Sequence, residues 1–244
     1  MSQLVSLHHQ HHQHLRVNTQ LAESQGAHLH MVPVMLSEFL KLAVSFPIAI
    51  TKQKETGQFV CVALFGFESG ENLFFSQGQW DSLYIPLQIA RQPFFLGENN
   101  QSQTDDDRYL ICIDTANPAV QPHDGEALFD IHGQSTGYLE NIKAILAQLV
   151  QGESAIQPFC EHLMRMQLLQ PMQFEITFAN GESTTVEGLY TINEQRLQQL
   201  SGEELAHLQQ QGWLAPLYSM VVSLGHIYRM VDKKNQRLAQ TALQ

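Results

Sequence analysis

The chain has 244 residues, of which 43% are hydrophobic, and its formal net charge is -11. This length suits one large domain or two small ones with a buried core. The negative charge argues against a nucleic-acid surface, which needs clustered Lys and Arg, and against binding to anionic lipid. We expect the few basic residues near the end, Lys233, Lys234 and Arg237, to form a solvated helix end.

Cysteine usage and the missing targeting signals indicate the compartment. Cys61, Cys112 and Cys160 are widely spaced and form no CxxC pair, so zinc and redox motifs are absent and a reducing compartment is favoured. The first apolar residues are interrupted at once by histidines, unlike a secretory signal. The longest apolar stretch, residues 42–50, is about half a membrane span. We therefore predict a cytoplasmic protein without a membrane span.

Residues 1–30 are polar and rich in Gln and His, and we predict that they form a mostly disordered tail. Imidazole is a good ligand for transition metals. The weak metal-ligand candidates are His8, His9, His11, His12 and His14. A His-Gln run without a surrounding fold makes no rigid site, so a solvated tail is favoured and we expect neither a metal nor a cofactor.

From residue 31 the sequence becomes periodic. Apolar or β-rich runs predict strands at 48–51, 59–67, 73–75, 109–114 and 127–131. Between the third and fourth of these, the polar segment 97–108 carries Asp105, Asp106 and Asp107. Three adjacent carboxylates lack the alternating spacing of an EF-hand, so we expect a mobile solvated loop.

Helical signals dominate the second half of the chain. Apolar residues at helical spacing predict helices over 138–150, 156–169 and 217–238. Alternation over 174–178 followed by Asn180-Gly181 predicts a hairpin, and Ser201 with Glu204 forms a capping box.

Clustered strands and paired helices predict an α+β fold with a largely antiparallel sheet and a C-terminal helical and hairpin subdomain. The expected domain covers 31–244, with possible subdomains 31–135 and 136–244.

A loop with aromatic residues and one arginine is the main candidate for recognition. An arginine among aromatic rings stacks on them and binds carboxylates through its planar fork. The candidate ligand-binding residues are Asn72, Trp80, Tyr84, Arg91, Phe94 and Asp114. A structural alternative stays open, in which Trp80 and Phe94 pack in the core and Arg91 pairs with an internal acid such as Asp114.

The segment Gly133-Gln134-Ser135-Thr136-Gly137 fits the G-x-S-x-G pattern of a nucleophile elbow, and it lies between a strand-like run and a helix. His162, His207 and His226 follow in the order of an α/β hydrolase. However, no His-Gly-Gly oxyanion loop precedes the segment, and Ser and Thr are also favoured helix N-caps. The sequence therefore favours a cap and keeps Ser135 as a minor candidate for the catalytic nucleophile.

Several short motifs from about residue 32 to residue 230 agree in order and spacing with one bacterial family. They include Val32-Pro33-Val34, Tyr84-x-Pro86, Arg91-x-Pro93-Phe94, Cys112-Ile113-Asp114, Gly125-Glu126-x-Leu128-Phe129, Gly188-Leu189-Tyr190-x-Ile192-Asn193-Glu194 and Gly212-Trp213-Leu214. The chain thus resembles the SapC-like family. It departs from the family where Thr115 and Asn193 replace acidic residues, which questions any chemistry of those carboxylates.

The resemblance and the residues together favour a non-enzymatic binding or accessory protein that recognises a small acidic or aromatic ligand or a protein partner. Two other hypotheses of function stay open. One is an enzyme, either a hydrolase using Ser135 or a tailoring enzyme beside a tryptophan-halogenase-like system, as the family's gene neighbours imply. The other is a surface-array component, as the family name implies. Neither the partner nor the oligomeric state follows from the sequence.

Overall fold

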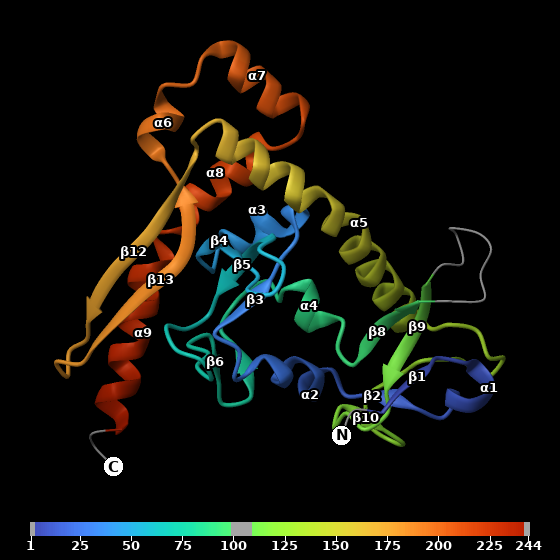
Figure 1. Cartoon of the computed structure of the whole chain (residues 1–244). Coiled ribbons are helices and arrows are strands. Elements are labelled where there is room, and N and C mark those ends of the chain that lie inside the picture. The colour runs from blue at the N-terminus through green and yellow to red at the C-terminus, as the bar shows by residue number, and fades with distance from the viewer. Residues whose placement is uncertain (1–2, 99–108, 242–244) are drawn as a thin grey trace. The chain divides into compact units, whose positions relative to one another are not determined.

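The computed structural model describes residues 3–98 and 109–241 (Figure 1). The chain divides into two compact units. Unit 1 comprises 1–27, 77–80 and 87–151 within the described range, and unit 2 comprises 28–76, 81–86 and 152–244. The units alternate along the chain. This division differs from the single boundary between residues 135 and 136 that the sequence led us to expect.

Unit 2 is built on a five-stranded sheet in the order β12-β13-β4-β5-β3. Its strands are β3 (Met31–Pro33), β4 (Ile48–Lys52), β5 (Phe59–Leu64), β12 (Leu169–Thr177) and β13 (Ser183–Ile192). Every neighbouring pair is antiparallel, which confirms the predicted α+β class with an antiparallel sheet. The central strands β4 and β5 carry the predicted apolar runs, and most of their residues are buried.

The β12–β13 hairpin is paired to the rest of this sheet over a short stretch only. Its turn contains the predicted Asn180-Gly181 signal, and Gly181 has φ +86°, which favours glycine. The hairpin pairs with β4 only at Leu189 and Tyr190. Beside this point the register shifts between Met172 and Phe174, and Gly188 has φ +76°. The distal half of the hairpin therefore continues beyond its pairing with β4.

Helices follow the hairpin in unit 2. They are α6 (Glu194–Gln198), α7 (Gly202–Gln210), α8 (Leu214–Ser223) and α9 (His226–Thr241). The predicted capping box opens α7, since Ser201 Oγ accepts from Glu204 N and Glu204 Oε2 accepts from Ser201 N. The single helix expected over 217–238 is instead two helices, because the chain leaves helical pairing at Leu224 and Gly225. Glycine supports a helix interior poorly.

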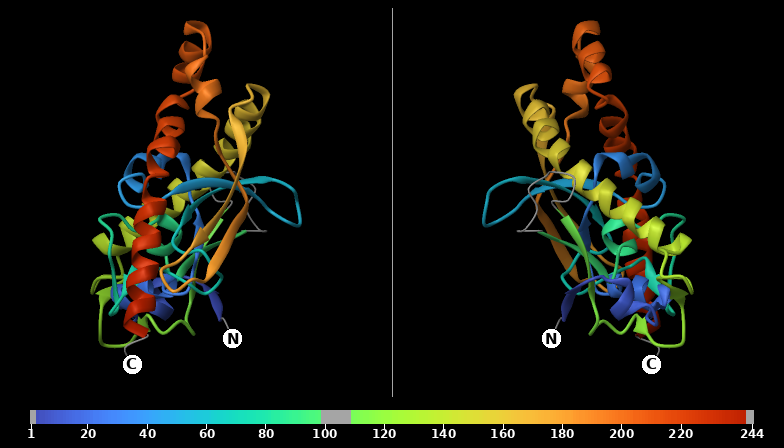
Figure 2. Two further views of the ribbon diagram at one scale, coloured as in Figure 1. Left: turned by 90° about the vertical axis from the view of Figure 1, so that its left-hand side faces the viewer. Right: turned by 90° about the vertical axis from the view of Figure 1, so that its right-hand side faces the viewer.

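Helix α9 lies beside the β12–β13 hairpin, as all three views show (Figure 2). Asn235 Oδ1 accepts from Ala179 N in the hairpin turn at 2.8 Å. The basic residues of α9 are not the solvated end that we expected. Lys234 donates to Glu71 Oε1 at 2.7 Å, Lys233 pairs with Asp81, and Arg237 donates to the Phe75 carbonyl. The error arose because Glu71 and Asp81 are distant in sequence.

Unit 1 contains two small antiparallel sheets. One has the order β1-β9-β8 and the other the order β10-β2-β11. The strands are β1 (Leu4–Ser6), β2 (Arg16–Val17), β7 (Gln79–Trp80), β8 (Phe94–Glu98), β9 (Tyr109–Asp114), β10 (Val120–Gln121) and β11 (Glu126–Ala127). The helices are α1 (His9–His12), α2 (Thr19–Glu23) and α4 (Leu87–Ala90).

The N-terminal segment differs from the disordered tail expected over residues 1–30. From residue 3 the described chain is structured: β1 pairs with β9, Val17 is fully buried, and Asn18 Oδ1 caps α2 through Leu21 N. These elements are only two to five residues long. Such short elements leave no periodic signal in the sequence, and their pairing partners lie about a hundred residues away.

A single helix, α5 (Gly137–Arg165), replaces the two helices expected over 138–150 and 156–169. The polar, glycine-containing segment between the two apolar runs caused this error. A Cβ on Gly152 would lie 2.8 Å from Met35 Cγ, so the glycine allows close packing inside the helix. Phe159 and Leu163 are fully buried on the same helix.

Two of the expected strands are formed only in part. Residues 73–75 and 127–131 form no full strand, and only the short β6 (Phe75–Ser76) and β11 overlap them. Asp105, Asp106 and Asp107 lie outside the described residues.

Short helical elements η2 (Leu36–Glu38) and α3 (Phe39–Leu42) precede β4, and η1 (Ser24–Gly26) follows α2.

The cysteines and the helix lengths complete the description of the fold. Cys61, Cys112 and Cys160 are free and buried, as small apolar side chains are expected to be. Among the described residues, no helix combines the length and the hydropathy that crossing a membrane requires.

The junction between α8 and β4 generates a testable prediction. Ser223 Oγ accepts from the buried Ile48 N at 2.9 Å and donates to the Met220 carbonyl. Ser223→Ala leaves the Ile48 N–H buried without its acceptor, so we expect the free energy of unfolding to fall by about 1–3 kcal/mol. Denaturant titration followed by circular dichroism measures this change.

Ser219→Ala is the matched control, because Ser219 is also buried on α8 but only donates to the Ala215 carbonyl of its own helix. Its effect is expected to stay below about 1 kcal/mol. Equal losses for the two variants would show that the Ile48 contact contributes nothing specific.

Candidate functional site

The six residues predicted to bind a ligand belong to both units. Trp80, Arg91, Phe94 and Asp114 lie in unit 1, whereas Asn72 and Tyr84 lie in unit 2. Within unit 1, the structure brings Phe94 and Asp114 close together, because β8 and β9 are paired and Asp114 N donates to the Pro93 carbonyl.

Arg91 binds its own chain. Its Nε donates to Gln88 Oε1 at 2.8 Å, its Nη1 donates to the Phe94 carbonyl at 2.7 Å, and its guanidinium lies over the Phe95 ring. Burial lowers the pKa of Arg91. These contacts join α4 to the start of β8, so Arg91 holds the local chain as the clamp alternative supposed, although with different partners from the acid we named.

The neighbours of Arg91 also have structural contacts. Trp80 Nε1 donates to the Glu23 carbonyl at 3.1 Å, and its ring packs so closely on Gly26 that a Cβ there would collide with it. Phe94 is fully buried. Asp114 Oδ1 accepts from Gln3 N at 2.7 Å and from Ala116 N at 3.1 Å.

The two predicted residues of unit 2 have comparable roles. Asn72 is buried, and its Oδ1 accepts from Phe74 N at 2.8 Å. The Tyr84 hydroxyl donates to Glu38 Oε1 at 3.1 Å, while Glu38 Oε2 accepts from Met35 N. Burial and the Glu38 carboxylate raise the pKa of Tyr84. The ligand-binding role of all six residues stays a prediction.

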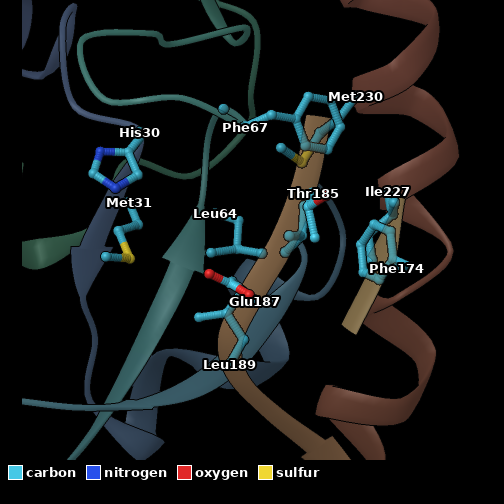
Figure 3. A pocket seen from close by; sticks show the side chains of 12 residues that line it. His30, Met31, Leu64, Phe67, Phe174, Thr185, Glu187, Leu189, Ile227 and Met230 are labelled. Carbon is cyan, nitrogen blue, oxygen red and sulfur yellow. The ribbon is translucent and has the colours of Figure 1, made fainter. Parts of the chain in front are cut away.

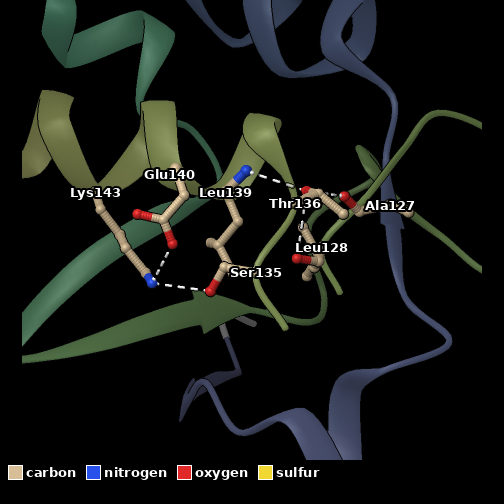
Figure 4. Close-up of polar contacts among 7 residues, drawn as sticks. All are labelled: Ala127, Leu128, Ser135, Thr136, Leu139, Glu140 and Lys143. Carbon is tan, nitrogen blue, oxygen red and sulfur yellow. Dashed lines mark hydrogen bonds and ion pairs between the residues drawn. The ribbon is translucent and has the colours of Figure 1, made fainter. Parts of the chain in front are cut away.

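Ser135 lies just before α5 and contacts Lys143 (Figure 4). Lys143 Nζ donates to Ser135 Oγ at 2.8 Å and pairs with Glu140 Oε1 at 2.7 Å. The helix cap comes from Thr136, whose Oγ1 accepts from Leu139 N and donates to the Ala127 carbonyl. The cap interpretation is thus confirmed for Thr136, and Ser135 is left in contact with a cation.

The histidines that follow Ser135 in the sequence make their contacts in unit 2. His162 and His207 have ring centroids 4.9 Å apart and pack near Trp213, whereas His226 Nε2 contacts the Ala43 carbonyl at 2.9 Å. None of these contacts is with Ser135, so they provide no Ser-His pair for a hydrolase.

The tail histidines use ring nitrogens for local structure. His8 Nδ1 accepts from Gln10 N, and His12 Nδ1 accepts from His8 N. Across the described ranges there is no group of three or more His, Cys, Asp or Glu side chains arranged to hold a metal ion.

The candidate functional site is a pocket in unit 2 that sequence reasoning missed (Figure 3). We call it the hairpin pocket, and its volume is about 160 Å³. It is lined by His30, Met31, Leu64, Gly66, Phe67, Phe174, Thr185, Val186, Glu187, Leu189, Ile227 and Met230. These residues come from β3 and the residue before it, from β5 and the segment after it, from the hairpin and from α9.

The hairpin pocket forms where the hairpin leaves the sheet. Leu189 is the first residue of β13 that pairs with β4, and Phe174 follows the register shift in β12. Helix α9 supplies Ile227 and the fully buried Met230. The signals that could have located the pocket are Gly188 and the shifted alternation around Phe174, but the contribution of α9 has no local signal.

The walls of the hairpin pocket are apolar, and its polar side chains are few. Leu64, Leu189 and Met230 are buried, whereas Thr185 and Glu187 are exposed at the rim. A cavity of about 150 Å³ lined by Leu, Ile and Phe binds benzene. The hairpin pocket therefore has the size and chemistry for one small aromatic molecule.

The model of the SapC family matches residues 7–230 of the chain. The match confirms the resemblance and begins earlier than the motifs did. Neither the comparison with curated proteins nor the comparison with solved structures gave a match. The structure also explains one departure from the family pattern: Asn193 Oδ1 caps α6 by accepting from Arg196 N, a role that Asp performs equally well.

The contacts of Arg91 predict a structural effect of its substitution. Arg91→Met keeps the aliphatic stem but removes the charged donors to Gln88 and to the Phe94 carbonyl, so we expect the free energy of unfolding to fall by about 1.5–3 kcal/mol. Chemical denaturation measures the loss. Arg165→Met, at an exposed position of α5, is the control and should change stability by less than about 0.5 kcal/mol. If Arg91→Met is as stable as this control, the clamp assignment is wrong and the recognition role regains weight.

Proposed function

The chain belongs to the SapC family, and we propose that it acts as a binding protein for a small neutral aromatic molecule held in the hairpin pocket. One observation carries the proposal: side chains from several strands of the sheet and from α9 line a largely apolar pocket of about 160 Å³ in unit 2. A pocket of this kind, with a few polar groups at its edge, is typical of small-molecule sites.

The side chains at the walls favour an aromatic ligand over an aliphatic one. Phe67 and Phe174 present rings, and aromatic pairs prefer edge-to-face or offset contacts. Met31 and Met230 bring thioether sulfurs, which make favourable contacts with aromatic rings. Methionine is also flexible, so its side chain adapts to rings of slightly different shape.

The rim limits the charge of the ligand. Glu187 is an acceptor-only group when ionised, and it disfavours a second negative charge near the pocket. The same carboxylate accepts from an N–H or O–H on a ring, and His30 provides a second polar group. The aromatic part of the expected ligand is thus supported at this pocket, and an acidic ligand is not. Indole and phenol have the required chemistry.

We favour a binding function for the chain over hydrolysis by a nucleophilic Ser135. A nucleophilic serine needs a neighbouring base that accepts its proton. Lys143 Nζ donates to both Ser135 Oγ and Glu140 Oε1, and an ammonium group has no lone pair to accept a proton. The tailoring-enzyme and surface-array readings, the cytoplasmic location and the identity of any protein partner stay predictions.

Filling the hairpin pocket tests the proposal. Val186 is half-buried on β13 and lines the pocket, so in Val186→Trp the new indole occupies the space of the ligand. We expect wild-type protein to bind indole in calorimetric titration and in saturation-transfer NMR, and Val186→Trp to lose at least about 90% of this binding, a tenfold rise in Kd. Strands accept Trp well, so the fold should persist.

Val222→Trp is the matched control, because Val222 is exposed on α8 and does not line the hairpin pocket. Its affinity for indole should equal that of the wild type. Unchanged indole binding by a folded Val186→Trp variant, or no binding of benzene, phenol or indole to the wild type at millimolar concentration, would contradict the proposal.

A further inference from the structure

Unit 1 contains a second pocket, of about 320 Å³, around Ser135. Its polar lining includes Ser135, Lys143, His8 and His9, and its apolar lining includes Phe129 and Leu139. We propose that this serine pocket binds a monocarboxylate with an aromatic or apolar body. This inference rests on different residues from the hairpin pocket and is independent of the function proposed there.

The carboxylate would bind at Lys143 and Ser135. An ammonium group has three N–H donors, and the contacts of Lys143 to Ser135 Oγ and Glu140 Oε1 account for two of them. The third donor remains for a ligand oxygen. Ser135 Oγ, 2.8 Å from Lys143 Nζ, places a hydroxyl group beside it, and this hydroxyl also bonds to the Glu140 carboxylate. Charge-assisted hydrogen bonds of this kind are stronger than neutral ones.

His8 adds a further donor to the serine pocket. Its Nδ1 accepts from Gln10 N at 3.3 Å, which fixes the neutral ring as the tautomer with its hydrogen on Nε2. His9 stacks on His8 and meets the Phe129 ring edge-on at 6.4 Å. A Cβ on Gly133 would lie 3.0 Å from His9 Cδ2, so glycine gives the His9 ring its room.

The remaining wall explains why the ligand is more than a simple anion. Leu7, Ile111, Phe129 and Leu139 line the pocket with apolar surface. A small inorganic anion leaves this surface in contact with water, whereas an aromatic ring or short alkyl chain covers it. The volume, twice that of the hairpin pocket, accommodates a ring joined to a carboxylate by a short chain.

Glu140 restricts the charge of the ligand. It is exposed, and Lys143 lowers its pKa, so it is ionised at neutral pH. A dianion such as phosphate would meet a carboxylate already paired with Lys143, the one lysine among the described residues of the lining. A ligand with a single negative charge is repelled less strongly by Glu140. It can also share Lys143 with Glu140, because an exposed ion pair is weak. The same pairing explains why Ser135 recognises an anion instead of acting as a nucleophile.

The test is calorimetric titration of the full chain with 3-phenylpropionate, together with its neutral analogue 3-phenylpropionamide. We expect the acid to bind and the amide to bind at least about tenfold more weakly, since a hydrogen bond to a charged group is lost. Lys143→Met should weaken binding of the acid by about tenfold or more, and Ser135→Ala by a smaller factor. Glu140→Gln should strengthen it, because a competing carboxylate is removed.

Two controls separate this site from general effects. Lys54→Met removes an exposed lysine outside the pocket lining and should leave the affinity unchanged. Val186→Trp, which fills the hairpin pocket, should also leave it unchanged, so the two proposals fail independently. Equal affinities for acid and amide, unchanged binding in Lys143→Met, weaker binding in Glu140→Gln, or no binding at 10 times the concentration used for indole would each overturn the inference.

Discussion

The packing of α9 against the β12–β13 hairpin is the constraint on which the proposed site of unit 2 depends. The hairpin has only two residue pairs with β4, so its distal half needs another partner. Asn235 holds the hairpin turn, and the ammonium of Lys234 lies over the Phe178 ring while pairing with Glu71. The same helix supplies Ile227 and Met230 to the hairpin pocket. Fixing the hairpin and lining the pocket are thus two results of one packing arrangement.

This arrangement also gives a physical meaning to part of the family pattern. Gly188 adopts a positive φ where the hairpin leaves β4, and Leu189 beside it is a buried wall of the hairpin pocket. Asn193 starts α6 immediately after β13. The aromatic and arginine motif around Arg91 has a different role, because its contacts hold α4 to β8 in unit 1. One family motif therefore lines a pocket, whereas the other makes contacts that join neighbouring elements of the chain.

The sequence predictions that proved correct are those that rest on local signals. Asn180-Gly181 marked the hairpin, and Ser201 with Glu204 marked the start of α7, because both act within a few residues. The pairing of β1 with β9 and the continuity of α5 through Gly152 depend on distant residues and escaped prediction. The hairpin pocket escaped for the same reason, since its walls come from five segments. The Ser135 motif was noticed, but its partner Lys143 was not.

The most direct test of the central claim is a methyl NMR titration of the full chain with indole. Binding in the hairpin pocket predicts intermolecular nuclear Overhauser effects from indole protons to the methyl groups of Met31, Met230 and Leu64, which line it. The methyl groups of Met164, which is exposed, and Met220, which is buried elsewhere in unit 2, should remain unaffected. Effects confined to methyl groups outside the pocket, or none at saturating indole, would contradict the account.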